Sequence, residues 1–156
     1  MEYYDGATVK SINIADAVNE CKKLVGGDES KVTIDVIMNS GGTFKEKDAS
    51  KFKAIRMGLR YVEILYYYRS MDLILRAKYA YKNVNFRYVV APTSSLAGGL
   101  LPFSFDAKDI EENINHGIRD AQQVISFGEG KSFDKIIKYT ELKTQGKTRQ
   151  DYGEFL

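Results

Sequence analysis

The chain has 156 residues, of which 44% are hydrophobic and 28% are charged, and its formal net charge is +2. This length suits one domain with a buried core, and the composition differs from that of a disordered chain. Apolar runs fall short of the roughly 18–20 residues that cross a bilayer, and the single cysteine, Cys21, has no partner for a disulfide within the chain. We therefore expect a cytoplasmic protein that makes no membrane contact.

A short helix and a strand are predicted near the start of the chain. Asn13 is a good N-cap, and Gly26-Gly27 is a good stop, for a helix at about 14–25. Cys21 falls on the apolar stripe of this helix, which favours a buried, inert thiol. Between residues 31 and 38, apolar side chains alternate with polar ones, a pattern typical of a half-buried strand.

A long, basic and tyrosine-rich helical segment follows, from about residue 48 to residue 82. Its apolar residues recur at three-, four- and seven-residue steps, which predicts a helix with one buried stripe. The stripe consists of Phe52, Ile55, Leu59, Val62, Tyr66 and Leu73. A continuous helix of this length would reach on the order of 50 Å, so Gly58 and Arg69-Ser70 are candidate breaks.

A second strand and two more helices are predicted in the second half of the chain. Residues 83–91 have the pattern of a turn followed by a strand. Asp106 is a good N-cap for a helix at about 107–126, and Ser132 is a good N-cap for a shorter helix at 133–142. We expect the buried face of the 107–126 helix to consist of Ile110, Ile114, Ile118, Ala121 and Ile125.

Together these elements predict one α+β domain, mainly α, over residues 1–156. An extended N-terminal arm (about 1–8) and a polar C-terminal tail (about 143–156) are expected to contact neighbouring subunits. The small-residue loop at 94–99 would suit close backbone contact between subunits.

No catalytic constellation is evident in the sequence, and no cofactor is expected. Glu112, His116 and Asp120 lie at four-residue steps on one helix face, where such a row can bind a metal ion or share a proton. His116 is the single histidine of the chain, so a zinc site or a catalytic triad would need partners from elsewhere. We interpret the row as a solvated polar face.

The segment from Gly128 to Ser132 ends like a phosphate-binding loop. That motif requires a glycine five residues before Gly130, where the chain has Ile125. The segment also follows a helix, whereas the motif follows a strand. The sequence therefore favours an ordinary connection between two helices over a nucleotide site.

Positive charge and tyrosine concentrate in the middle of the chain. Residues 44–88 hold eleven Lys and Arg against four Asp and Glu, a net charge of +7. Tyrosine is a favoured interface residue, so we expect contacts with other subunits at Tyr61, Tyr66, Tyr67, Tyr68, Tyr79 and Tyr81. In the alternative, nucleic acid is bound, with phosphates on the cations and bases stacked on the rings. Those cations are Lys51, Lys53, Arg56, Arg60, Arg69, Arg76 and Lys78. No recognised DNA- or RNA-binding signature accompanies them.

These patterns favour a non-enzymatic structural subunit of a homo-oligomeric ring or tube, such as a virion component, a phage head–tail connector or a tail protein. Its partners would be copies of itself or other assembly proteins, and its location would be the virion if it is viral. A nucleic-acid-binding protein is the alternative hypothesis. A small metal- or nucleotide-dependent enzyme is the third.

Overall fold

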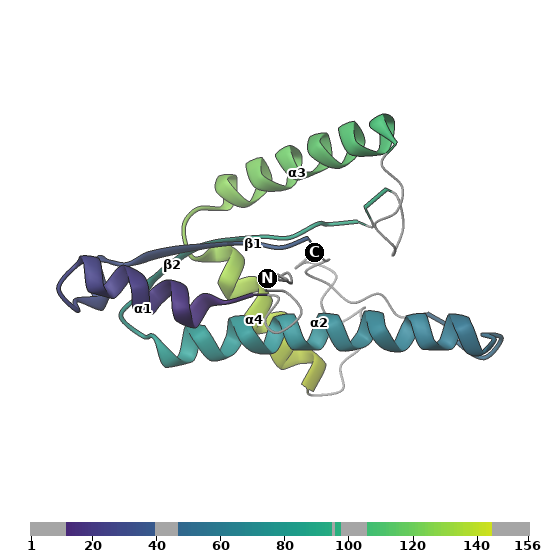
Figure 1. Ribbon diagram of the computed structural model, residues 1–156, viewed down its shortest axis with the longest axis horizontal. Coiled ribbons are helices and arrows are strands. Elements are labelled where there is room, and N and C mark those ends of the chain that lie inside the picture. Colours follow the sequence, from purple (N-terminus) through teal and green to yellow (C-terminus); the bar gives the residue numbers. More distant parts are fainter. Residues whose placement is uncertain (1–11, 40–46, 95, 98–105, 145–156) are drawn as a thin grey trace, which may run out of the picture. The chain divides into compact units, whose positions relative to one another are not determined.

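The computed structural model describes residues 12–39, 47–94, 96–97 and 106–144 (Figure 1). These residues form a mainly helical α+β fold with four α-helices, one 3-10 helix and a two-stranded sheet, which confirms the predicted fold class. The predicted N-terminal arm and the tail beyond residue 144 lie outside the described residues. The described elements belong to two compact units.

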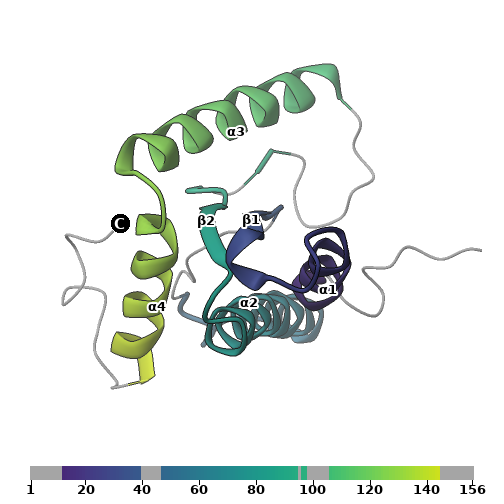
Figure 2. The same cartoon turned by 90° about the vertical axis from the view of Figure 1, so that its left-hand side faces the viewer.

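The first unit contains α1 (Ile14–Leu24), η2 (Glu29–Lys31) and α2 (Ala54–Ala80). α1 contacts α2 and lies alongside its C-terminal half (Figures 1 and 2). The buried residues of α1 are Ile14 and Val18. The helix predicted at about 14–25 is therefore confirmed.

Two details of α1 show how it ends and where its cysteine lies. Gly26 and Gly27 follow the helix with φ angles of +67° and +88°, which only glycine adopts without strain. Cys21 is half-buried, so the thiol is less enclosed than the sequence predicts.

α2 is one continuous helix of 27 residues, about 40 Å long at 1.5 Å per residue. Neither candidate break interrupts it. Its buried residues are Arg60, Tyr67, Ser70, Met71, Ile74 and Ala77. The predicted stripe is wrong, because Ile55, Leu59 and Tyr66 are exposed and the other three members are half-buried. Apolar residues surround most of α2, and the buried face includes Arg60 and Ser70, which hydrophobic periodicity cannot select.

The second unit is organised around a parallel pair of strands, β1 (Thr33–Ile37) and β2 (Asn85–Val90). Both predicted strands are confirmed, and β1 alternates as expected, with Ile34 and Val36 buried. Parallel strands need a crossover connection, which residues 38–84 supply. A register shift after Ile34 leaves Arg87 as the extra residue of β2.

α4 (Lys131–Thr144) packs against β2 on the side away from β1 (Figure 2). The Gly130 amide donates to the Arg87 carbonyl over 2.8 Å. The Ser132 hydroxyl oxygen accepts from the Val89 amide, also over 2.8 Å. The prediction that Ser132 caps the helix is wrong, because α4 begins at Lys131 and the hydroxyl bonds to β2 instead.

An aromatic pair forms the core between β2 and α4. Phe86 and Phe133 are both fully enclosed, and their ring centroids lie 5.3 Å apart in an edge-to-face arrangement. This geometry is the favoured one for aromatic pairs. The pair therefore fixes α4 against the strand.

α3 (Ala107–Phe127) is the helix predicted at about 107–126, and it contacts both β2 and α4. The Asp106 carboxylate caps it as expected, accepting from the amides of Lys108 at 2.9 Å and Asp109 at 3.3 Å. The prediction for its buried face is wrong. Exposure is 44% for Ile110, 58% for Ile114, 50% for Ile118 and 57% for Ile125, and Ala121 is half-buried.

Candidate functional site

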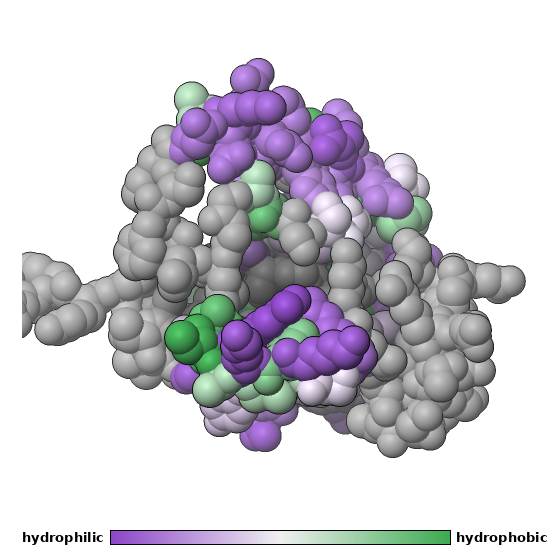
Figure 3. Space-filling model, turned by 90° about the vertical axis from the view of Figure 1, so that its right-hand side faces the viewer, coloured by the Kyte–Doolittle hydropathy of each residue, from purple (hydrophilic) through white to green (hydrophobic). Residues whose placement is uncertain are grey.

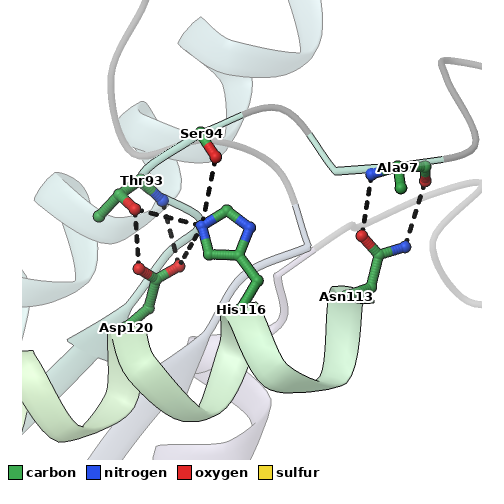
Figure 4. A network of polar contacts seen from close by, with 6 residues as sticks. All are labelled: Thr93, Ser94, Ala97, Asn113, His116 and Asp120. Carbon is green, nitrogen blue, oxygen red and sulfur yellow. Dashed lines mark hydrogen bonds and ion pairs between the residues drawn. The ribbon is translucent and has the colours of Figure 1, made fainter. Parts of the chain in front are cut away.

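The polar face of α3 holds the segment that follows β2 (Figure 4). Asn113, His116 and Asp120 recur at three- and four-residue steps, so they share one face of the helix. The Asn113 amide pairs with both backbone groups of Ala97: its oxygen accepts from the Ala97 amide at 2.9 Å, and its nitrogen donates to the Ala97 carbonyl at 3.1 Å.

Asp120 is the centre of this contact. Its carboxylate accepts from the Thr93 hydroxyl at 2.8 Å and from the Thr93 amide at 3.2 Å. The His116 Nε2 atom lies 3.2 Å from the second carboxylate oxygen. The side chains of His116 and Asp120 are 12% and 6% exposed. Burial of a carboxylate without hydrogen-bond partners would be costly, and here both carboxylate oxygens of Asp120 have partners. The interpretation of Glu112, His116 and Asp120 as a solvated face is therefore wrong for His116 and Asp120, whereas Glu112 is exposed.

The histidine contacts do not have the geometry of a catalytic triad. In a triad, one ring nitrogen faces the carboxylate and the other faces the nucleophile. Here Nε2 alone lies near Asp120, near the Thr93 hydroxyl at 3.2 Å and near the Ser94 hydroxyl at 3.4 Å. The Thr93 hydroxyl moreover donates to Asp120. The arrangement acts as a clamp between α3 and the segment after β2.

The structure brings only two of the three candidate metal ligands into contact. His116 and Asp120 are in contact, whereas Glu112 is exposed. In the part of the chain that the structure describes, no group of three or more His, Cys, Asp or Glu side chains could hold a metal ion.

The Gly128–Ser132 segment is a turn between α3 and α4 with its polar groups engaged. Gly128 and Gly130 have φ angles of +92° and +78°. The Gly130 amide and the Ser132 hydroxyl, which a phosphate would need, already bond to β2. The geometry agrees with an ordinary connection between helices.

The six tyrosines predicted at an interface are divided between surface and core. Tyr61, Tyr68 and Tyr79 are exposed, and their seven- and eleven-residue spacings place them on one face of α2. Tyr66 is also exposed, but on a different face. Tyr67 is buried with its ring edge-on to that of Tyr68, and Tyr81 is half-buried.

The seven cations of the nucleic-acid hypothesis do not share one face of α2. Arg56, Arg60 and Lys78 lie on one side, and Arg69 and Arg76 lie about half a turn away. Lys51 and Lys53 are exposed just before the helix. On the side of the molecule where α2 begins, hydrophobic residues lie beside hydrophilic ones at the surface (Figure 3).

Two of these arginines are held by carboxylates of the same helix. Arg76 pairs with Asp72 at 2.7 Å, and the buried Arg60 pairs with Glu63 at 2.8 Å. Burial acts to raise the pKa of Glu63, but hydrogen bonds from Arg60 and Lys47 outweigh it and hold this pKa below its ordinary value. Part of the positive charge of the middle segment therefore serves α2 itself.

Comparison of the chain with protein-family models, curated proteins and solved structures finds no match. None of the helices in the described residues combines the length and the apolar character that crossing a bilayer requires.

Sequence reasoning missed the partners of the α3 polar face. The sequence predicts a contact between subunits for the loop at 94–99, and it predicts no contact of Thr93, Ser94 or Ala97 with α3, although Thr93-Ser94 offers two hydroxyls. The three- and four-residue spacing of Asn113, His116 and Asp120 could have predicted this contact, because residues at such spacing share one face of a helix and can be buried together. These three polar residues therefore lie on the inward face of α3.

Proposed function

We propose that this chain is a non-enzymatic assembly subunit that works through protein–protein contact, with copies of itself as the first partners. The observation that carries the proposal is the orientation of α3. An amphipathic helix normally turns its apolar stripe to the core. α3 instead uses its polar face for contact within the unit and leaves four isoleucines at the surface.

Covering this stripe of isoleucines with a partner would be energetically favourable. Full burial of an isoleucine contributes about 1.5–3 kcal/mol, and large exposed apolar patches mark interaction sites. With exposures between 44% and 58%, each of the four isoleucines would contribute on the order of 1 kcal/mol when covered. Such a sum can offset part of the cost of association.

The tyrosine face of α2 gives independent support. Tyr61, Tyr68 and Tyr79 present large rings with polar tips to solvent on one side of the helix. Such rings give contact area at a low entropic cost. The chain therefore has a second surface suited to a protein partner. The ring or tube, the virion and the cytoplasmic location remain predictions from the sequence.

The proposal is tested by the native mass of the purified chain. Light scattering over a hundredfold range of concentration should show a species heavier than 17.7 kDa that grows with concentration. A mass that stays at the monomer value throughout would contradict self-assembly.

Nucleic-acid binding is the second candidate, and the exposed start of α2 is the observation that favours it. Lys51, Lys53 and Arg56 are exposed there, and the Arg56 guanidinium lies 4.2 Å from the centre of the Phe52 ring. Binding to phosphates predicts an affinity that falls steeply with salt. Absence of binding to single- and double-stranded oligonucleotides at low salt would remove this candidate.

A further inference from the structure

We propose that two copies of the chain pair through α3, with the two helices antiparallel about a two-fold axis that passes between Gly117 and Ile118. This inference rests on the proposed function and names the partner and the surface. It follows from three properties of the outward face of α3: its order of large and small residues, its distribution of charge and its exposed glycine.

When two copies of α3 run in opposite directions, large residues at the centre of the outward stripe of one helix face small residues on the other. An antiparallel pair centred between Gly117 and Ile118 sets Ile110 against Ile125 of the second copy. It sets Ile114 against Ala121, and Ile118 against Gly117. The two central layers thus each oppose a large residue to a small one, the arrangement that lets facing helices interdigitate. A two-fold interface requires such self-complementarity.

The charges of α3 favour the antiparallel direction. The first turns carry Asp109, Glu111 and Glu112, whereas residues 122–127 carry no charged side chain. A parallel pair would bring the acidic ends of two helices together, and like charges repel. An antiparallel pair sets each acidic end against the uncharged end of the other helix. It also opposes the two helix dipoles.

Within the described residues, no close contact requires a glycine at position 117. Gly117 lies in the middle of α3, where glycine is a poor helix former. A Cβ atom at this position would meet nothing within 4 Å, and the residue is exposed. The absence of a side chain would, however, let a second helix approach closely at the two-fold axis. The pair of helices therefore explains a glycine that the isolated unit does not need.

The first test uses the substitution Gly117→Gln in the full chain. Glutamine is a good helix former and the site has open space, so the variant should keep or raise its resistance to urea. The same side chain would occupy the place of the partner's Ile118 and should weaken dimerisation about tenfold or more. Opposite effects on folding and pairing cannot arise from misfolding.

Gly58→Gln is the matched control. Gly58 is likewise exposed inside a helix, α2, and a Cβ atom there also meets nothing within 4 Å. This variant should gain in helix stability without a change in the dimer dissociation constant. Both variants and the unmodified chain are compared by analytical ultracentrifugation over the same concentration series.

A second test uses disulfide cross-links to determine whether the two helices are parallel or antiparallel. The native cysteine is first removed by Cys21→Ser. Ile118→Cys should cross-link to itself, because position 118 lies beside the axis. Position 110 of one copy lies about 22 Å along the pair from position 110 of the other, beyond the reach of a disulfide. Ile110→Cys should therefore cross-link only when mixed with Ile125→Cys. Self-cross-linking of Ile110→Cys would overturn the antiparallel arrangement.

The outcomes separate this inference from the function on which it rests. Dimerisation that Gly117→Gln weakens and Gly58→Gln leaves unchanged supports both. If the unmodified chain assembles and neither variant changes this assembly, pairing through α3 is overturned and the proposed assembly function is retained. A monomer at every concentration overturns both.

Discussion

The orientation of α3 predicts an unusual order of effects for two substitutions on this helix. Asp120→Ala removes the acceptor for the amide and hydroxyl of Thr93. A donor left without a partner costs about 1–3 kcal/mol when buried, and water can reach part of this contact, so we expect a total loss of about 1–3 kcal/mol. Ile118→Gln removes a side chain that is already 50% exposed, so its cost should be about 1 kcal/mol or less.

The assay is urea unfolding followed by far-ultraviolet circular dichroism, at low micromolar chain to keep dimers scarce. With an unchanged m-value, the shift in midpoint gives the change in the free energy of unfolding. If the isoleucine stripe faced inward, Ile118→Gln would cost about 2–5 kcal/mol, as large core truncations do. Asp120→Ala would then lie within about 0.5 kcal/mol of the unmodified chain, as surface changes do. A larger loss for Ile118→Gln than for Asp120→Ala would refute the orientation described here.

Three further predictions concern the second unit. Phe133→Ala should lower the free energy of unfolding by about 3–5 kcal/mol, because the ring is fully buried against Phe86; thermal and urea melts check this. Ser132→Ala leaves a β2 amide without its acceptor and should cost about 1–3 kcal/mol, with faster hydrogen exchange at that amide as the specific readout. The hydrogen bond from Arg87 holds the pKa of Asp35 below its ordinary value, so this pair stabilises the fold above about pH 3.9 and less as the pH falls through the lowered pKa. Asp35→Asn should therefore be less stable than the unmodified chain at neutral pH, and a stability gap unchanged down to pH 2 would contradict this.

Local signals in the sequence were sufficient to place most elements. Asp106 bonds to the first amides of α3, as its position before an apolar stripe predicted. The alternation around Ile34 and Val36 predicted β1 with the correct buried side. These signals act within a few residues, so they hold whatever the rest of the chain does.

The directions in which helices face could not be predicted in the same way. Periodicity identifies an apolar stripe on α3, but which face lies inward depends on the hydrogen bonds that Asp120 accepts from Thr93, 27 residues away. α2 shows the same limit, because its buried face includes Arg60. The pattern of hydrophobic residues cannot predict that a polar side chain will be buried because it finds a hydrogen-bond partner in the folded chain.

The contact of α4 with β2 has a consequence for how copies of the chain can associate. The outer edge of β2 has its Arg87 carbonyl and its Val89 amide occupied by the first turn of α4. A strand from another molecule would need those two groups to continue the ladder. Edge-to-edge growth of the kind that leads to fibrils is therefore blocked along this side. If copies of the chain associate as proposed, this side of the sheet contributes no strand-to-strand contact between them.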